Sequence, residues 1–306
     1  MSLLLLGVFY LDNQLDQIDL TDTAAQKIFL GRHYLPAGLL LLLAFIAMIG
    51  LVTRELCRIF SAKQIAADPL MIWLSGTLGC VLIYIIPYTL DSQATIAIYA
   101  SLMVFIFVLA LLKHSLQRNA NGAVTVAGVT MFSLIYIGVL PGFYLAIRRW
   151  HSAWVIAAII FIAKSCDIGA YFTGKALGRH KLIPWLSPGK TWEGLIGGLV
   201  LSSLLATVLA ILGNYYQISG RWQSSETGRI FLNNPYSLWF AAGAGCLIGL
   251  AGQFGDLIAS LFKRDAGIKD SGKSIPGFGG MLDVVDSTII AAPVAYWLLQ
   301  TAVLIQ

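Results

Sequence analysis

Three aspartates near the C-terminal end of the sequence are spaced for chemistry on a metal ion. Asp283 and Asp286 lie three positions apart at the expected start of the last helix, so their carboxylates share one helix face, one turn apart. Asp256 lies upstream, beside a cluster of basic residues. Carboxylates at this spacing suit a hard cation such as Mg²⁺, which completes its octahedron with water and substrate phosphate. We therefore predict a metal site at Asp256, Asp283 and Asp286; the alternative is that these acids only offset the macrodipole at a helix start.

Basic residues and glycines surround these aspartates. Nine of the 35 charged residues of the chain lie between Asp256 and Asp286. The cations of this stretch are Lys263, Arg264, Lys269 and Lys273, and its closely spaced glycines are Gly277, Gly279 and Gly280. Glycine lets a backbone approach a ligand closely and cations neutralise phosphate, so we interpret the stretch as a phosphate clamp, with Asp270 orienting cations or binding a second ion. By themselves, these cations are also explained as ordinary loop charges or by attraction to anionic lipid headgroups.

Residues 164 to 194 form a second stretch of the same kind. Lys190 follows a Pro-Gly pair that favours a shaped turn, and we interpret it as a further phosphate contact. Glu193 is interpreted, like Asp270, as a residue that orients cations or binds a second ion. Lys164 and Asp167 are three apart near the end of an apolar run; they are explained either by a structural ion pair or by a functional site, since ionisable residues within a membrane are commonly functional.

The remaining polar candidates receive no catalytic role. Glu55 stands beside Arg54 and Arg58 and is expected to pair with them at the membrane interface. The four histidines are scattered without evident partners, and the four cysteines lack the spacing of a metal site, so packing is the expected role of the thiols.

The elements that position these residues are expected to be transmembrane helices. The mean hydropathy is +0.79, only 11% of residues are charged, and apolar runs of about 20 residues recur, a length that crosses a bilayer. Backbone groups in lipid must be hydrogen-bonded internally, so the runs are predicted to be helices and the fold an all-α polytopic membrane bundle. Eight spans are predicted, at about 35–52, 70–88, 94–112, 123–147, 152–172, 194–213, 237–262 and 282–304.

The chain divides into three parts on this basis. Residues 1–34 are expected to be an interfacial segment that is retained, because the start lacks the basic region of a signal peptide. Residues 35–163 form the N-terminal transmembrane helices, and residues 164–306 form a C-terminal catalytic transmembrane region. Lys and Arg number 13 in one set of loops and six in the other, so the positive-inside rule puts both charged stretches on the cytoplasmic side.

At these two stretches the sequence resembles the phosphatidate cytidylyltransferase, or CDP-diacylglycerol synthase, family. The C-terminal family signature is matched by Ser260, Lys263, Arg264, Lys269, Asp270, Pro276, Gly277, Gly279, Gly280, Asp283 and Asp286, preceded by Gly255, Asp256 and Leu257. The upstream family motifs are matched by Asp167, Ala170, Tyr171, Phe172 and Gly174, and by Ser187, Pro188, Lys190, Thr191, Glu193 and Gly194. These motifs cover about the last 140 residues, and the first 160 resemble the family only in being helical spans.

The resemblance implies an enzyme of phospholipid biosynthesis that joins CTP and phosphatidic acid into CDP-diacylglycerol and pyrophosphate. It implies Mg²⁺ at Asp256, Asp283 and Asp286 and phosphate contact by Lys263; the second cation, at Asp270 and Glu193, is our interpretation of the residues themselves. The implied partners are CTP, phosphatidic acid and membrane lipids, with no nucleic acid; a homodimer is left open. The implied location is the cytoplasmic (inner) membrane, with the active site facing the cytoplasm.

Two positions depart from the family pattern. Phe278 stands where the family has histidine, and Val284 stands where it has arginine. Alternatives therefore remain: a catalytically degenerate homologue, a lipid kinase or other CTP-using membrane transferase, and a transporter. A transporter would carry charged residues near mid-span on several helices, whereas these cluster toward one interface.

Overall fold

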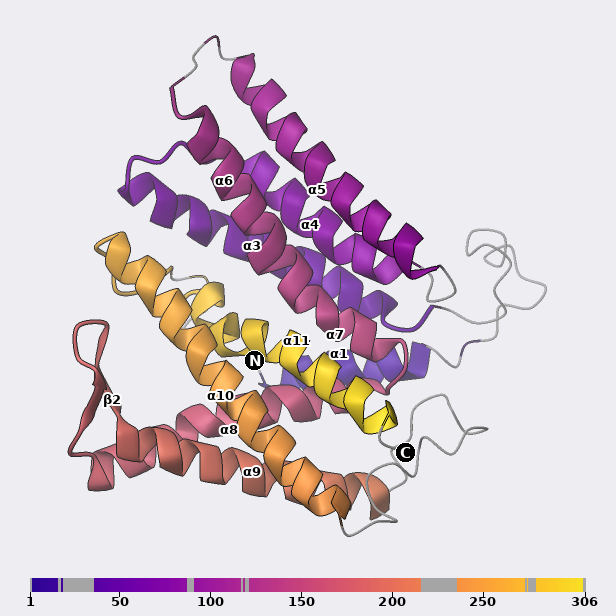
Figure 1. Ribbon diagram of the computed structural model, residues 1–306, viewed down its shortest axis with the longest axis vertical. Helices are drawn as coiled ribbons and strands as arrows, with labels where there is room; N and C mark the ends of the chain where they lie inside the picture. Colours follow the sequence, from indigo (N-terminus) through magenta and orange to yellow (C-terminus); the bar gives the residue numbers. More distant parts are fainter. Residues whose placement is uncertain are drawn as a thin grey trace.

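The computed structural model is a bundle of long helices (Figure 1). It describes residues 2–15, 18, 36–86, 91–116, 118, 121–215, 236–272, 274 and 279–304. The helices are α1 (Ser2–Leu15), α3 (Leu39–Ala62), α4 (Pro69–Ile85), α5 (Ser92–Ser115), α6 (Ala123–Ser133), the π-helix η1 (Leu134–Val139), α7 (Leu140–Arg148), α8 (Ala153–Leu177), α9 (Trp192–Tyr215), α10 (Tyr236–Asp265) and α11 (Met281–Leu304).

The prediction of an all-α polytopic bundle is confirmed. Seven helical segments of the described chain are long and apolar enough to cross a membrane, with α6, η1 and α7 together forming one of them, and α4 is a shorter apolar helix. The protein is therefore an integral membrane protein. The N-terminal helix α1 is held to the bundle by a buried ion pair, because Arg148 Nε donates to Asp12 Oδ2 over 2.6 Å and Leu41 N donates to Asp12 Oδ1 over 3.1 Å.

Two helices extend further than the hydropathy pattern predicts. The first span was expected to end near residue 52, but α3 continues to Ala62 and carries Arg54, Glu55 and Arg58 within the helix. Likewise α8 continues to Leu177, beyond the expected end near residue 172. Hydropathy falls where the charged residues begin, but a helix ends only where its backbone hydrogen bonds end, so the expected boundaries were too early.

Helices α8, α9 and α10 pack closely through small residues. A Cβ atom added at Gly198 of α9 would lie 2.5 Å from the carbonyl oxygen of Cys166, and one added at Gly249 of α10 would lie 2.4 Å from the Ser202 hydroxyl. Small residues let helix backbones approach closely where lipid supplies no hydrophobic drive for association. These contacts hold α8 and α10 against α9, and both α8 and α10 carry residues of the predicted site.

A short antiparallel hairpin, absent from the sequence prediction, joins α8 to α9. Its strands are β1 (Lys181–Ile183) and β2 (Ser187–Thr191), with Lys181 opposite Thr191. In Figure 1 the hairpin lies at the same side of the molecule as the C-terminal end of α10. The end of α3 is tied to that of α10 by Lys63 Nζ, 2.9 Å from Asp265 Oδ1. The elements that carry the predicted site residues therefore lie together at one end of the bundle.

Candidate active site

Residues from the two predicted stretches meet inside this end of the bundle. Lys190 Nζ, at the end of the hairpin, lies 2.6 Å from Asp256 Oδ2 of α10 and donates a hydrogen bond of 2.9 Å to Gln253 Oε1. Gln253 is buried, and its Nε2 donates over 2.7 Å to Asp167 Oδ1 of α8. Lys190, Gln253 and Asp167 therefore form a continuous polar chain from the hairpin into the helices.

A second lysine joins α8 to α11. Lys164 Nζ lies 3.4 Å from Asp286 Oδ1 and 3.9 Å from Asp167 Oδ2. Asp286 is only 4% exposed, and its carboxyl group is within hydrogen-bonding reach of that of Asp256. The ion pair expected between Lys164 and Asp167 is present, but Lys164 approaches Asp286 more closely and so belongs to the wider cluster.

Asp283 lies at the N-terminus of α11 and accepts hydrogen bonds from the loop before this helix. Its Oδ1 accepts a hydrogen bond of 2.8 Å from Lys263, and its Oδ2 accepts bonds from Ser271 N, Ser271 Oγ and Gly280 N at 3.1, 2.9 and 3.0 Å. Gly279, in between, has φ +87°, a left-handed conformation that glycine adopts without strain. The helix-start role considered as the alternative is thus visible for Asp283.

The donor set fits a divalent cation at the Asp256 and Asp286 pair. Two adjacent carboxylates are the ligands that Mg²⁺ commonly takes from protein, alongside water and phosphate. Within the described residues, no group of three or more His, Cys, Asp or Glu side chains is arranged to hold a metal ion. The sharing of one ion by Asp256, Asp283 and Asp286 stays a prediction, and the carboxylate oxygens of Asp283 already accept hydrogen bonds from the protein.

Four other predicted residues of the described chain lie outside this cluster. Arg264, Lys269 and Asp270 are exposed. Glu193 accepts hydrogen bonds from Arg179 N and His180 N, both at 3.2 Å, and lies 2.6 Å from His180 Nδ1, so it braces the hairpin. His180, expected to lack a partner, therefore has one.

The glycine stretch is described only in part. Gly280 donates to Asp283, and Gly279 precedes it. Lys273, Gly277 and Phe278 lie outside the described residues.

The sequence interpretation missed Glu55. This residue is 3% exposed, and its carboxylate accepts hydrogen bonds from Met281 N and Leu282 N at 2.7 and 2.8 Å rather than pairing with its arginine neighbours. The signal for this position was its place on the helix face: Glu55 follows Val52 by three residues and precedes Ile59 by four, and both are buried. A charged residue on an apolar helix face indicates a buried partner.

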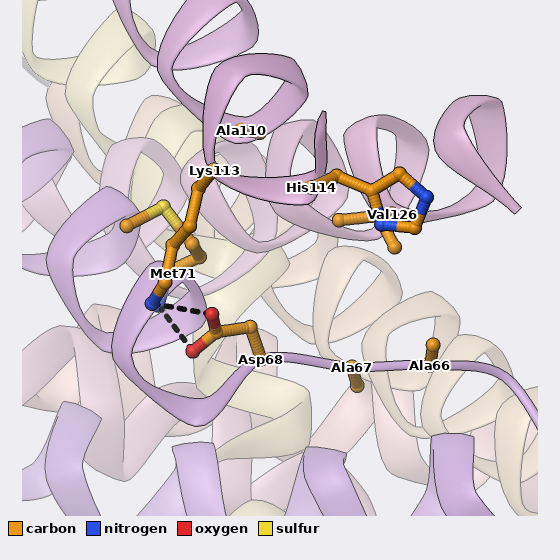
Figure 2. Close-up of a pocket in the computed structure, with 8 residues that line it drawn as sticks. All are labelled: Ala66, Ala67, Asp68, Met71, Ala110, Lys113, His114 and Val126. Atoms are coloured by element: carbon orange, nitrogen blue, oxygen red, sulfur yellow. Dashed lines mark hydrogen bonds and ion pairs between the residues drawn. The ribbon is translucent and has the colours of Figure 1, made fainter. Parts of the chain in front are cut away.

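A pocket elsewhere in the bundle is separate from this site. It is lined by residues of the segment before α4 and of α4, α5 and α6, namely Ala66, Ala67, Asp68, Met71, Ala110, Lys113, His114 and Val126 (Figure 2). Within it Lys113 pairs with Asp68, which also accepts a hydrogen bond from Leu70 N and so caps α4. These polar groups stabilise a helix start, and none of them was a predicted site residue.

Fold and polar cluster together define a polytopic membrane protein with a charged site toward one end of its bundle. A model of the cytidylyltransferase family matches residues 21–302, and the chain belongs to this family. The predicted family and the predicted nucleotidyltransferase class are thereby confirmed.

Relatives named phosphatidate cytidylyltransferase occur in several bacteria. The Staphylococcus saprophyticus protein is 31% identical over 253 residues, covering 82% of this chain and 85% of the relative. The Staphylococcus aureus protein is 30% identical over 274 residues, covering 89% and 95%. A Chlamydia pneumoniae protein of that name is 34% identical over 188 residues, a match that covers 59% of this chain and 56% of the relative.

Proposed function

We propose that this protein is a phosphatidate cytidylyltransferase, which transfers CMP from CTP to phosphatidic acid and yields CDP-diacylglycerol and pyrophosphate. The observation that carries the proposal is the joined cluster of Lys190, Asp256, Asp286 and Lys164 within an apolar bundle. Family membership and the names of the staphylococcal relatives support it. A charged site toward one end of a membrane bundle suits a reaction between a water-soluble nucleotide and a lipid headgroup.

The reaction is a displacement at phosphorus. A phosphate oxygen of phosphatidic acid forms a bond to the α-phosphorus of CTP, and the bond from that phosphorus to the oxygen bridging to the β-phosphate breaks. The electron pair leaves with pyrophosphate. Catalysis of phosphoryl-type transfer consists chiefly of positioning and charge neutralisation.

The protein's own residues have separate tasks in this scheme. Lys190 and Lys263 contact phosphate oxygens in this scheme, and their ion pairs with the neighbouring site carboxylates Asp256 and Asp283 support that role. Gln253 fixes the position of Lys190 relative to Asp167, because it accepts a hydrogen bond from Lys190 and donates one to Asp167. Arg264 and Lys269, exposed at the same end, attract the polyanionic nucleotide.

The balance of charge supports a requirement for Mg²⁺. In the described cluster, three lysines form ion pairs with four aspartates. The lysines are Lys164, Lys190 and Lys263, and the aspartates are Asp167, Asp256, Asp283 and Asp286. The cluster therefore has no excess positive charge to offset that of a triphosphate. Asp256 and Asp286 would hold the cation. When bound, a divalent cation neutralises phosphate charge and stabilises the pyrophosphate leaving group.

The proposed setting is the inner membrane, with the site open to the cytoplasm, where the nucleotide is supplied. The excess of Lys and Arg in the loops at the site end supports this orientation.

Pyrophosphate release from CTP by the purified protein tests the proposal. We expect release that depends on both phosphatidic acid and Mg²⁺, with the labelled cytidine recovered in a lipid. A panel of other lipid phosphates is run in parallel. Formation of CDP and a phosphorylated lipid without pyrophosphate would show a lipid kinase instead, and an absence of any CTP-dependent product would leave the transporter alternative.

A further inference from the structure

Glu55 of α3 lies under the N-terminus of α11, in the half of the chain that carries none of the site motifs. Its Oε1 accepts hydrogen bonds from Met281 N, at 2.7 Å, and from Ser274 Oγ. Its Oε2 accepts bonds from Leu282 N and Ser271 Oγ, at 2.8 and 3.0 Å. Both carboxylate oxygens are therefore fully engaged by the loop before α11 and by the first turn of that helix.

This arrangement compensates a buried charge. A buried carboxylate is costly unless it is paired or hydrogen-bonded, and Glu55 is 3% exposed. The N-terminus of a helix offers free N–H groups and a partial positive charge, both of which favour a carboxylate. The backbone is fitted around it, because a Cβ atom added at Gly272 or Gly280 would lie 3.0 or 2.7 Å from the Glu55 side chain.

Ser271 connects Glu55 to the site. Its Oγ lies 3.0 Å from Glu55 Oε2 and 2.9 Å from Asp283 Oδ2, so the hydroxyl bridges both carboxylates and, with one hydrogen, donates to either of them. Asp283 in turn accepts a hydrogen bond of 2.8 Å from Lys263. A displacement of Glu55 would therefore pass through Ser271 and Asp283 to a lysine proposed to contact phosphate.

We propose that Glu55 is a positioning residue for the transfer reaction: it fixes the first turn of α11 and, through Ser271, the place of Asp283 and Lys263. It does not contact substrate. One consequence concerns phosphate binding, for which helix N-termini are common sites. Met281 N and Leu282 N donate to Glu55 and Gly280 N donates to Asp283, so phosphate recognition falls to the lysines instead.

The inference rests on the proposed function, and Glu55→Gln tests it. An amide keeps one acceptor oxygen and turns an NH₂ group toward groups that are themselves donors. For monodisperse protein in detergent we expect kcat to fall about 30-fold or more while KM for CTP changes less than about threefold, because Lys190 and its partners are left in place. Hydrogen exchange at the first turn of α11 should become faster in the variant, and this readout needs no activity.

Asp68→Asn is the matched control. Asp68 also accepts backbone hydrogen bonds at a helix start, from Leu70 N and Met71 N, but it lies in the separate pocket beside α4. We expect this variant to keep the wild-type kcat. Should Glu55→Gln fail to fold, Ser271→Ala carries the test, with an expected loss in kcat of about tenfold from breaking the link to Asp283.

The outcomes separate this inference from the proposed function. A wild-type protein without phosphatidate-dependent pyrophosphate release would contradict the proposed function. The hydrogen-exchange comparison would still test whether Glu55 stabilises the first turn of α11. An active wild type with unchanged kcat and unchanged exchange in Glu55→Gln, or with unchanged kcat in Ser271→Ala where that variant is needed, would overturn the inference.

Discussion

At the scale of a single residue, Asp286 contributes to two parts of the site at once. It is buried, pairs with Lys164 and lies within hydrogen-bonding reach of the carboxyl group of Asp256. Asp286→Asn removes a proposed cation ligand and leaves Lys164 with a weaker partner. We expect turnover to fall more than about 100-fold, equivalent to about 2.7 kcal/mol of barrier, while the protein still inserts into membranes.

Pyrophosphate release measured over a range of Mg²⁺ concentrations checks this prediction. Loss of activity that excess Mg²⁺ partly restores would identify a ligand role. Near-normal, Mg²⁺-dependent turnover in Asp286→Asn would show that this carboxylate only pairs with Lys164.

Lys190 and Lys175 form a matched pair of lysines on neighbouring elements. Lys190 contacts Asp256 and Gln253, whereas Lys175 is exposed and lies 5.9 Å from the centre of the Tyr171 ring. We expect Lys190→Gln to lower kcat/KM for CTP about 100-fold and Lys175→Gln to change it less than about threefold. Steady-state kinetics on both variants decides; equal effects would mean that only overall positive charge matters.

The departures Phe278 and Val284 test whether the family's histidine and arginine are indispensable. The attacking lipid phosphate is already ionised near neutral pH, and the pyrophosphate leaving group is stabilised by Mg²⁺, so neither partner needs proton transfer from the protein. We expect the native protein to be active, and Phe278→His with Val284→Arg to change its rate less than about tenfold, or 1.4 kcal/mol. Turnover gained only in the double mutant would identify the native chain as a degenerate homologue.

At the scale of the element, close contact between α8 and α9 fixes the position of Asp167 relative to Lys190. Gly198 faces the backbone of α8, while Gly243 of α10 has no atom within 4 Å of an added Cβ. We expect Gly198→Leu to destabilise the bundle by about 3 kcal/mol or more, and Gly243→Leu to be nearly neutral. Thermal unfolding in detergent measures both; similar melting temperatures for the two variants would contradict this packing.

At the scale of the whole molecule, the orientation of the bundle decides which compartment supplies the nucleotide. Arg179 and Lys269 are exposed at the site end, and Gln93 is exposed at the start of α5. In a cysteine-free background, we expect a membrane-impermeant maleimide to label Arg179→Cys and Lys269→Cys only from the cytoplasmic side and Gln93→Cys only from the other side. Labelling of the first two from opposite faces would end the model of a single site.

The sequence by itself determined the class of fold, because 20-residue apolar runs in lipid leave the backbone no alternative to helix. It also identified the two charged stretches, because burying charged residues in a membrane protein costs free energy and those that are retained are commonly functional. Long motifs of fixed spacing at Asp167, Lys190 and Asp256 were enough to indicate the family. All of these are properties of local sequence.

Only the tertiary structure decided which of these charges meet. Glu193 and Lys190 are three residues apart, yet one braces the hairpin and the other contacts α10. Gln253 and Glu55 were missed because their roles depend on partners far away in sequence: Gln253 bonds Asp167 and Lys190, and Glu55 bonds the start of α11. Hydrophobic periodicity assigns a residue to a helix face, but the crossing of the helices determines what that face contacts, and that crossing depends on close approach at residues such as Gly198.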